Sequence, residues 1–424
     1  MRQKTYSVQT PEDLAKLSSE NDNLTVLSQL TKDQLRSSAS KWSLHHLIAY
    51  RLITQPEKSF LGAFENDHKH ECPICQPNKP STQQIDGDML ESLLQGVTRS
   101  DLLESERKLM QRPGGTFWIA LAQASNVASA HDPEARPSRE RRQVERPEYI
   151  NSTDIIIGSS SPTRPSSSSS SSFSSSSCSD YQMTVEHTDE DENERLQGIP
   201  EDKAVHLAIS FVRYVLQLCL IQPDGQMEVR ARVERITARA SIAGVKNITS
   251  EDDSGVSIYT KKPTGWFLAH PSMALIEAKR ASNCISIDPR NGRSSPIVSN
   301  GTIAQYLGEA VLTWREKQDE LHQDIFIIAM CNTFVRFIHF TFGSDYGEYL
   351  DASTETEQLQ IVGDTAKDTF AYVSWTKWFD LRMSEARRIA ACHLLTLVRL
   401  KLPIWERIEH HGGPDDAGYD GDEQ

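Results

Sequence analysis

The chain has 424 residues, 38% of them hydrophobic, and its 45 basic and 59 acidic side chains give a formal net charge of −14. This length allows two domains with cores of their own, and the acidic balance excludes a protein that coats nucleic acid over its whole surface. No run approaches the ~20 apolar residues of a membrane helix, and the start lacks the apolar core of a signal peptide. Because the seven cysteines are scattered, we expect an intracellular protein of the nucleus or cytoplasm, without membrane contact.

Residues 1–129 are polar but follow a helical period. Thr10 is followed by Pro11, Glu12 and Asp13, which is the pattern of a helix start with a capping hydroxyl, a proline in the first position and two early acids. Further helical spacing occurs at 31–37, 43–54, 87–94 and 101–110. These segments predict a separate, small, all-helical N-terminal domain.

Residues 130–200 have the composition of a disordered linker. The stretch from Ser159 to Ser179 is nearly pure serine, and the stretch from Glu186 to Glu194 is strongly acidic, so neither can bury enough apolar surface to fold. A short basic cluster, 139–142, is either a nuclear import signal or a solvated part of the linker. The acidic residues of 409–424 predict a disordered tail. We expect any protein partner to bind the linker or the N-terminal domain.

Residues 201–408 carry the pattern of one α/β (α+β) domain. Helical spacing from Asp202 to Leu220 is followed by strand-like alternation from Val229 to Ile242, with a phase slip near Glu234. Further strands are predicted at 255–260, 265–268, 273–280, 325–330 and 334–342, and helices at 302–317 and 375–400. This order of elements predicts a mixed central β-sheet flanked by helices.

Arginines occupy alternate positions of the predicted strand from Val229 to Ile242. They would line a phosphate-facing groove or form a solvated sheet face with salt bridges, and the pattern fits both. The residues are Arg230, Arg232, Arg235 and Arg239.

Glu277 and Lys279 follow the apolar run from Met273 to Ile276, two residues apart. On a strand, residues at this spacing point to the same face, so both could reach one phosphate. A carboxylate can hold Mg²⁺, and a nearby lysine can orient the attacking water or stabilise developing charge. The alternative is an ion pair at a sheet edge. The same spacing recurs in polar or helical contexts at Asp67/Lys69, Glu106/Lys108 and Glu201/Lys203.

A second carboxylate is expected from a neighbouring strand. Glu251, Asp252 and Asp253 stand just before the predicted strand at 255–260. We choose Asp253 as the ligand and keep Asp252 as the alternative. A plain polar turn between two strands is the other interpretation of these acids.

The segment from Ala274 to Arg280, followed by a helix that begins near Gln305, resembles motif II and the next helix of the PD-(D/E)XK nuclease superfamily, particularly its RecB-like branch. The longer arrangement is similar to uncharacterised fungal proteins with a PD-(D/E)XK-like domain. The resemblance covers about half of the chain. Its landmarks are an arginine-rich strand at 228–239, Asp252–Asp253, Gly265–Trp266, the motif strand, and the segments 305–314 and 325–342.

The resemblance implies a restriction-endonuclease-like core and a divalent-metal-dependent nuclease acting on nucleic acid, with DNA preferred over RNA. The chain departs from the pattern because no Pro-Asp dipeptide precedes Glu277 at the usual place and because Glu309 stands where RecB-like members carry tyrosine. A catalytically inactive nuclease fold, used as an interaction or regulatory module, is the alternative. The implied site residues are Asp253 and Glu277 as Mg²⁺ or Mn²⁺ ligands, Lys279 as the catalytic lysine, Glu234 (or Glu228) as the upstream acid and Gln305 as a substrate contact.

A second candidate metal site lies in the N-terminal region, where Cys72-Pro-Ile-Cys75 has the spacing of a knuckle that binds one Zn²⁺ through two thiolates. The sequence has no second Cys-x-x-Cys, so the remaining ligands would be histidines, and the ion would staple a small helical domain. The alternatives are a surface loop with two free thiols and a zinc-containing transcription- or chromatin-associated protein. The histidine candidates are His45 or His46 together with His68 or His70.

Overall fold

The computed structural model describes residues 5–79, 81–125, 201–222, 225–279, 285–287, 294–317 and 323–411. The linker expected at 130–200 and residues 412–424 of the expected tail lie outside the described residues. Within the described part of the chain, no helix combines the length and the apolar character that a membrane crossing requires.

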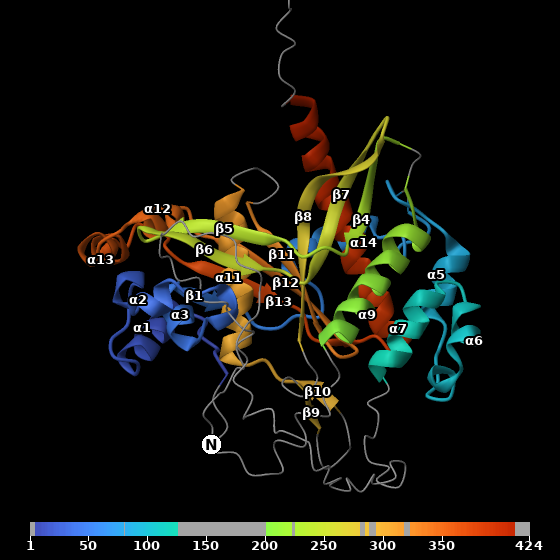
Figure 1. Cartoon of the computed structure of the whole chain (residues 1–424), viewed down its shortest axis with the longest axis horizontal. Helices are drawn as coiled ribbons and strands as arrows, with labels where there is room; N and C mark the ends of the chain where they lie inside the picture. The colour runs from blue at the N-terminus through green and yellow to red at the C-terminus, as the bar shows by residue number, and fades with distance from the viewer. Residues whose placement is uncertain are drawn as a thin grey trace, which may run out of the picture. The chain divides into compact units, whose positions relative to one another are not determined.

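An eight-stranded mixed sheet runs through the centre of the fold (Figure 1). Its strand order is β1-β13-β12-β11-β8-β7-β4, and β14 pairs with β12 beside β13. The pairs β8/β11 and β1/β13 are parallel, and the other pairs are antiparallel. The strands are β1 (Leu52–Thr54), β4 (Met227–Arg232), β7 (Ser254–Lys262), β8 (Gly265–Lys279), β11 (Ile325–Cys331), β12 (Phe334–Phe342), β13 (Ala371–Trp375) and β14 (Phe379–Asp380).

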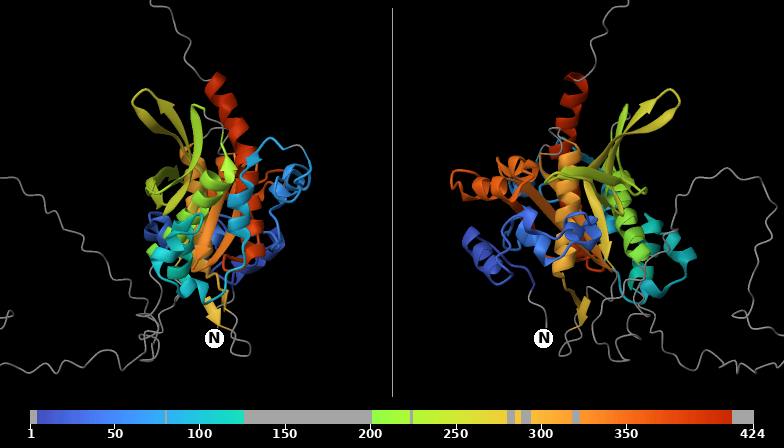
Figure 2. Two further views of the ribbon diagram at one scale, coloured as in Figure 1. Left: turned by 90° about the vertical axis from the view of Figure 1, so that its right-hand side faces the viewer. Right: turned by 60° about the vertical axis from the view of Figure 1, so that its left-hand side comes forward.

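Helices cover both faces of this sheet, which explains why β11 is apolar and buried along its whole length (Figures 1 and 2). One face packs against α4 (Gly62–Glu71), α5 (Gly87–Leu94), α7 (Gly115–Ser125), α9 (Glu201–Arg213) and α14 (Ser384–His411). The other packs against α1 (Pro11–Ser19), α3 (Leu44–Ala49), α11 (Asn300–Glu316) and α12 (Tyr346–Asp351). The α+β class, with a mixed central sheet flanked by helices, is confirmed.

The remaining elements are short or lie outside the main sheet. The helical ones are η1 (Leu27–Gln29), α2 (Lys32–Leu35), η2 (Ala39–Lys41), η3 (Asp101–Leu103), α6 (Glu106–Met110), the π-helix η4 (Tyr214–Cys219) and α13 (Glu355–Gly363). Three two-stranded pairs complete the set: β2 (Gln84–Ile85) with β3 (Leu220–Ile221), β5 (Thr237–Ile242) with β6 (Val245–Glu251), and β9 (Ile285–Ile287) with β10 (Ser294–Pro296).

The N-terminal region is helical, but it does not form the separate domain that the sequence led us to expect. Residues 1–127 and 197–424 make one compact unit. α1 and α3 contribute to the core on the α11 face, whereas α4, α5 and α7 contribute to the core on the α9 face. β1 also joins the main sheet by pairing with β13. The amphipathic helices of this region bury their apolar sides against the sheet and its covering helices, which supply the core.

Two predicted elements differ from the structure. The expected strand at 229–242 is split after Arg232, and its second half becomes β5, which leaves the main sheet and pairs with β6. The phase slip near Glu234 marks this break. The expected helix at 375–400 begins only at Ser384, because Phe379 and Asp380 pair with β12 as β14. Periodicity could not show that pairing, since it depends on the distant strand.

Candidate active site and a second candidate metal centre

The end of β8 places Glu277 and Lys279 on the face of the sheet that α11 covers. Side chains alternate along a strand, and Ala274, Ile276 and Ala278 belong to the core on the opposite, α9 side. Glu277 and Lys279 therefore project towards α11 and line a cleft of about 400 Å³. The cleft lies where the parallel strands β8 and β11 end, which is a common position for ligand sites in such sheets.

Asp253 enters the same cleft from the start of β7, the antiparallel neighbour of β8. Its backbone N–H donates to the Ile276 carbonyl at 3.1 Å, and its Oδ2 accepts from the backbone N–H of Ala278 at 2.9 Å. These two bonds fix the carboxylate beside Glu277. Its other oxygen, Oδ1, lies 3.2 Å from the guanidinium of Arg235.

Asp252 has a different role, although it is adjacent in sequence. It is buried, and its carboxylate accepts two hydrogen bonds from the buried Arg232, at 3.1 and 2.6 Å, and a third from the backbone N–H of Ile236 at 3.0 Å. This arrangement anchors the connection between β4 and β5. The structure thus places Asp253, and not Asp252, in the cleft.

Gln305 and Glu309 stand one turn apart on α11 and complete the wall opposite the sheet. The Gln305 side-chain Nε2 donates to Glu277 Oε1 at 2.5 Å and to Glu309 Oε1 at 2.9 Å. Lys279 also donates to Glu277 Oε1. Glu309 is 1% exposed, and its second oxygen, Oε2, has no hydrogen-bond partner in the structure. Two buried carboxylates therefore converge on one amide nitrogen.

Acidic side chains outnumber basic ones in the cleft, and burial shifts the pKa of several of them. Burial, with a further contribution from Asp253, outweighs the effect of Lys279 and raises the pKa of Glu277. Burial and the nearby Glu277 raise the pKa of Glu309 in the same way. Burial alone would lower the pKa of Lys279, but Glu277 more than offsets it and raises that pKa. The acids that line the cleft are Glu201, Glu251, Asp253, Glu277 and Glu309, against Arg235 and Lys279 as the basic residues.

The upstream acid proposed from the sequence does not lie in this cleft. Glu234 is exposed on the β4–β5 connection, and Glu228 lines a different hollow, with its carboxylate 2.5 Å from Arg230. Glu201, at the start of α9, lines the cleft instead. In the sequence, Glu201 stands out only through its acid-x-Lys spacing with Lys203. No local signal connects this helix start with β8. The arginines are likewise dispersed: of the four, Arg235 alone lines the cleft.

A second group of metal-ligand residues lies between α4 and α14. Its four donor atoms, from His68, Cys72, Cys75 and Cys392, all lie within 4.8 Å of one another. The Cys392 sulfur is 3.6 Å from the sulfurs of Cys72 and Cys75, and His68 Nε2 is 3.3 Å from the Cys75 sulfur. This group could hold a metal ion.

The ligand set differs from the one that the sequence suggested. His70 is exposed at the end of α4, and His45 and His46 lie on α3, where His46 accepts from the backbone N–H of Ser43 at 3.0 Å. These three histidines are not part of the group, whereas Cys392 on α14 is. The chain offered no signal for Cys392, because more than 300 residues separate it from Cys75 and it has no neighbouring cysteine or ligand motif.

In comparisons with family models, with curated proteins and with solved structures, none matched the chain.

Proposed function

We propose that this chain is a divalent-metal-dependent nuclease-like protein that hydrolyses phosphodiester bonds of nucleic acid at the β8–α11 cleft. The observation that carries the proposal is the convergence of Asp253, Glu277 and Lys279 in one cleft, from two neighbouring strands. The resemblance of this segment to the PD-(D/E)XK superfamily assigns these same three residues to the metal and to the reaction.

The residues of the cleft suit a hard divalent cation. Mg²⁺ and Mn²⁺ take oxygen ligands, and Asp253 and Glu277 present carboxylates from adjacent strands. The unpartnered Oε2 of Glu309 is a third buried carboxylate oxygen at the same place.

The residues of this chain have distinct tasks in such a reaction. When bound, a divalent cation would polarise a phosphoryl oxygen and lower the pKa of a bound water. Asp253 is held for ligation by the Ala278 N–H. Lys279, on the same strand face as Glu277, can orient the attacking water or stabilise charge on the phosphoryl group. Gln305 can exchange its bond to Glu277 for a contact with the substrate. We take DNA as the first substrate to test.

Cleavage assays on the full chain test this function. With Mg²⁺ or Mn²⁺, we expect cleavage of single- or double-stranded DNA, with RNA as a parallel substrate. Glu277→Gln and Lys279→Ala should each reduce the rate at least about a hundredfold, since each removes a group that stabilises the transition state. Glu106→Gln and Lys108→Ala are matched controls, because they have the same acid-x-lysine spacing on helix α6 and should retain full activity.

An inactive nuclease fold that serves as an interaction module is the second candidate. It is favoured by the state of Glu277, which is 2% exposed and accepts hydrogen bonds at Oε1 from both Lys279 and Gln305. These donors occupy one oxygen of the carboxylate, Oε1, without a cation. A folded chain with neither cation binding nor cleavage, and with no change in the Glu277 and Lys279 variants, would support this candidate and refute the nuclease.

For the cluster of His68, Cys72, Cys75 and Cys392, we propose Zn²⁺ as the ion. Three thiols and an imidazole are the donors that zinc prefers in tetrahedral structural sites. With Zn–S bonds of about 2.3 Å, the sulfurs of a tetrahedral site lie about 3.8 Å apart, close to the two distances of 3.6 Å. All four donor atoms lie within 4.8 Å of one another, which fits ligation of a single ion. Elemental analysis of the purified chain should find one zinc per molecule, and iron in its place would contradict the assignment.

A further inference from the structure

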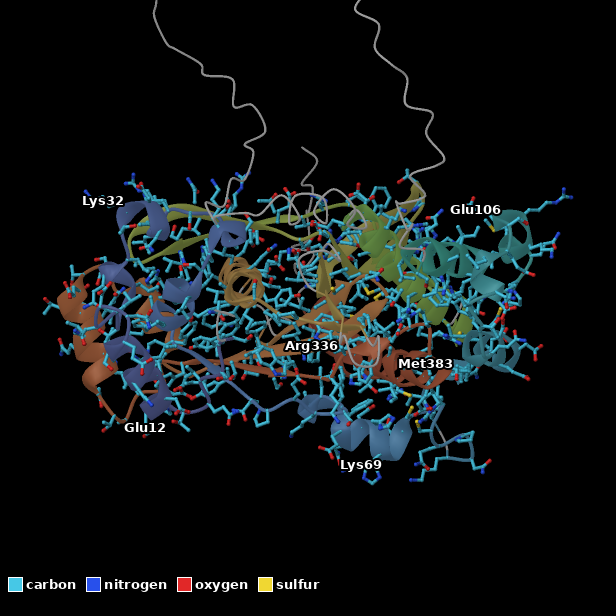
Figure 3. The ribbon with its side chains drawn as sticks, turned by 90° about the horizontal axis from the view of Figure 1, so that it is seen from below. Glu12, Lys32, Lys69, Glu106, Arg336 and Met383 are labelled. Atoms are coloured by element: carbon cyan, nitrogen blue, oxygen red, sulfur yellow. The ribbon has the colours of Figure 1, made fainter. Side chains whose placement is uncertain are left out.

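The four ligands of the second metal centre come from segments at opposite ends of the chain. His68 lies on α4, Cys72 ends that helix, and Cys75 follows in the next turn, whereas Cys392 lies on α14. In Figure 3 the helix that carries the labelled Lys69 lies beside the helix that begins just after the labelled Met383. An ion at this point would connect two segments that are 317 to 320 residues apart.

The surroundings of the cluster match a site built for thiolate ligands. Cys72 and Cys392 are fully buried. Arg388, one turn before Cys392, donates from Nη1 to the Cys75 sulfur at 3.0 Å. Three thiolates with one Zn²⁺ and a neutral imidazole carry one net negative charge, and the Arg388 guanidinium, which also pairs with Glu385, lies beside it. His68 is oriented by stacking on Phe60, with ring centroids 4.0 Å apart.

Beside the cluster, a buried ion pair joins α4 to α14, and the Leu61 N–H at the start of α4 donates to His393 Nε2 of α14 at 3.3 Å. Arg399 of α14 donates to Asp67 of α4, with Nε 2.9 Å from Oδ1, and it also donates to Gln83 at 2.6 Å. α14 itself carries a large part of the core on its face of the sheet, through Ala390, Leu394 and Leu397. Contacts that hold α14 against α4 therefore also help to keep these core side chains packed.

We propose that Cys392 is the fourth zinc ligand and that the ion is a structural clip that fastens the C-terminal helix α14 to the N-terminal segment 62–75. This inference rests on the zinc assignment above and is independent of the proposed nuclease activity. A link between segments so far apart removes much of the freedom of the unfolded chain, so the ion stabilises the whole fold and not a local loop.

Thiol labelling of the wild-type full chain tests the clip without relying on any variant. With zinc bound, Cys72, Cys75 and Cys392 should resist alkylation, and a chelator should expose all three together. Cys219 is a matched control, because it is a buried free thiol outside the cluster, and its labelling should lag behind. Exposure of Cys72 and Cys75 while Cys392 stays protected would overturn the assignment of the fourth ligand.

Hydrogen exchange on the same samples tests the role of the ion. Removing zinc should raise amide exchange in α4 and α14 together and lower the melting temperature by on the order of 10 °C. Increased exchange confined to residues 68–75 would show a local staple and overturn the clip.

Cys392→Ser should lose the zinc, whereas Cys219→Ser should retain it. If the wild-type chain contains no zinc, the zinc assignment and the clip both fail. If zinc is present and Cys392→Ser keeps it, only the clip fails. Neither outcome decides the proposed nuclease activity, which the cleavage assays of the wild-type chain test separately.

Discussion

Adjacent residues take different roles in this protein because strand geometry and buried partners separate them. Asp252 and Asp253 differ by one position, yet the first is anchored by Arg232 and the second faces Glu277 in the cleft. Since successive side chains of extended chain point in opposite directions, a one-residue choice decides which acid can be a ligand. The structure shows which of the two acids lines the cleft.

Asp324 is a residue whose ionisation contributes to the stability of the fold. Its Oδ2 accepts a hydrogen bond from His339 of β12 at 2.8 Å, and its Oδ1 contacts Lys401 of α14. Burial alone would raise the pKa of Asp324, but these two partners outweigh burial and lower the pKa from 3.8 to about 2. A carboxyl whose pKa is lower in the folded state stabilises the fold above its unfolded pKa and loses that effect as the pH falls through the folded pKa.

Asp324→Asn should therefore lower the free energy of unfolding at pH 7 by about 2 kcal/mol. The difference from wild type should shrink as the pH falls from about 4 towards 2. Urea unfolding at several pH values measures this. The exposed Asp351, paired with Arg315, is the control, and Asp351→Asn should have little effect at any pH. A deficit in Asp324→Asn that does not change with pH would contradict the assigned cause.

At the scale of elements, the cleft depends on how closely η2 approaches α11. Gly308 lies inside α11, and a Cβ at this position would come within 2.5 Å of the Ala39 Cβ and 3.1 Å of the Trp42 ring. Ser38, Ala39 and Ser40 also line the cleft. The absence of a side chain at Gly308 lets the N-terminal segment form one wall of the site.

Gly308→Ala should destabilise the protein by about 1–3 kcal/mol, although alanine in place of glycine normally stabilises a helix interior by about 1 kcal/mol. Thermal unfolding of wild type and Gly308→Ala measures whether the substitution lowers or raises the stability. Gly87→Ala, in the first turn of α5 where nothing lies within 4 Å of the added Cβ, should be neutral or stabilising. A more stable Gly308→Ala variant would show that η2 does not pack tightly on α11.

Sequence patterns identify the elements whose signals are local. The capping box at Thr10, the helix Gly87–Leu94 and the apolar strand before Glu277 were all readable, since each depends on neighbouring residues. Cys392, Glu201 and the pairing of Phe379 with β12 were not, because each depends on contacts between distant segments. The same limit explains why Cys72 and Cys75 were found while their other cysteine partner was missed.

At the scale of the whole molecule, the N-terminal segment and the C-terminal region share their cores. Residues 5–125 supply side chains to both faces of the sheet and one of its strands. Separating the two parts would therefore expose apolar surface on each of them.

Fragments of the chain test this shared core. A chain of residues 197–424 should fail to show cooperative thermal unfolding by itself, since it would lose α4, α5 and α7 from one face of its sheet, α1 and α3 from the other, and the edge strand β1. Co-expressed with residues 1–127, it should copurify as a complex and recover a single transition. Cooperative unfolding of residues 197–424 alone, at the melting temperature of the full chain, would show that the two parts are separate domains.

The central claim is that Asp253 and Glu277 bind a divalent cation in the β8–α11 cleft, and the most direct test is calorimetric titration of Mn²⁺ into the zinc-saturated full chain. Wild type should show one binding event that Glu277→Gln weakens by at least about tenfold, because a ligand is lost, while Glu106→Gln leaves it unchanged. No binding in wild type, or equal affinity in wild type and Glu277→Gln, would contradict the account.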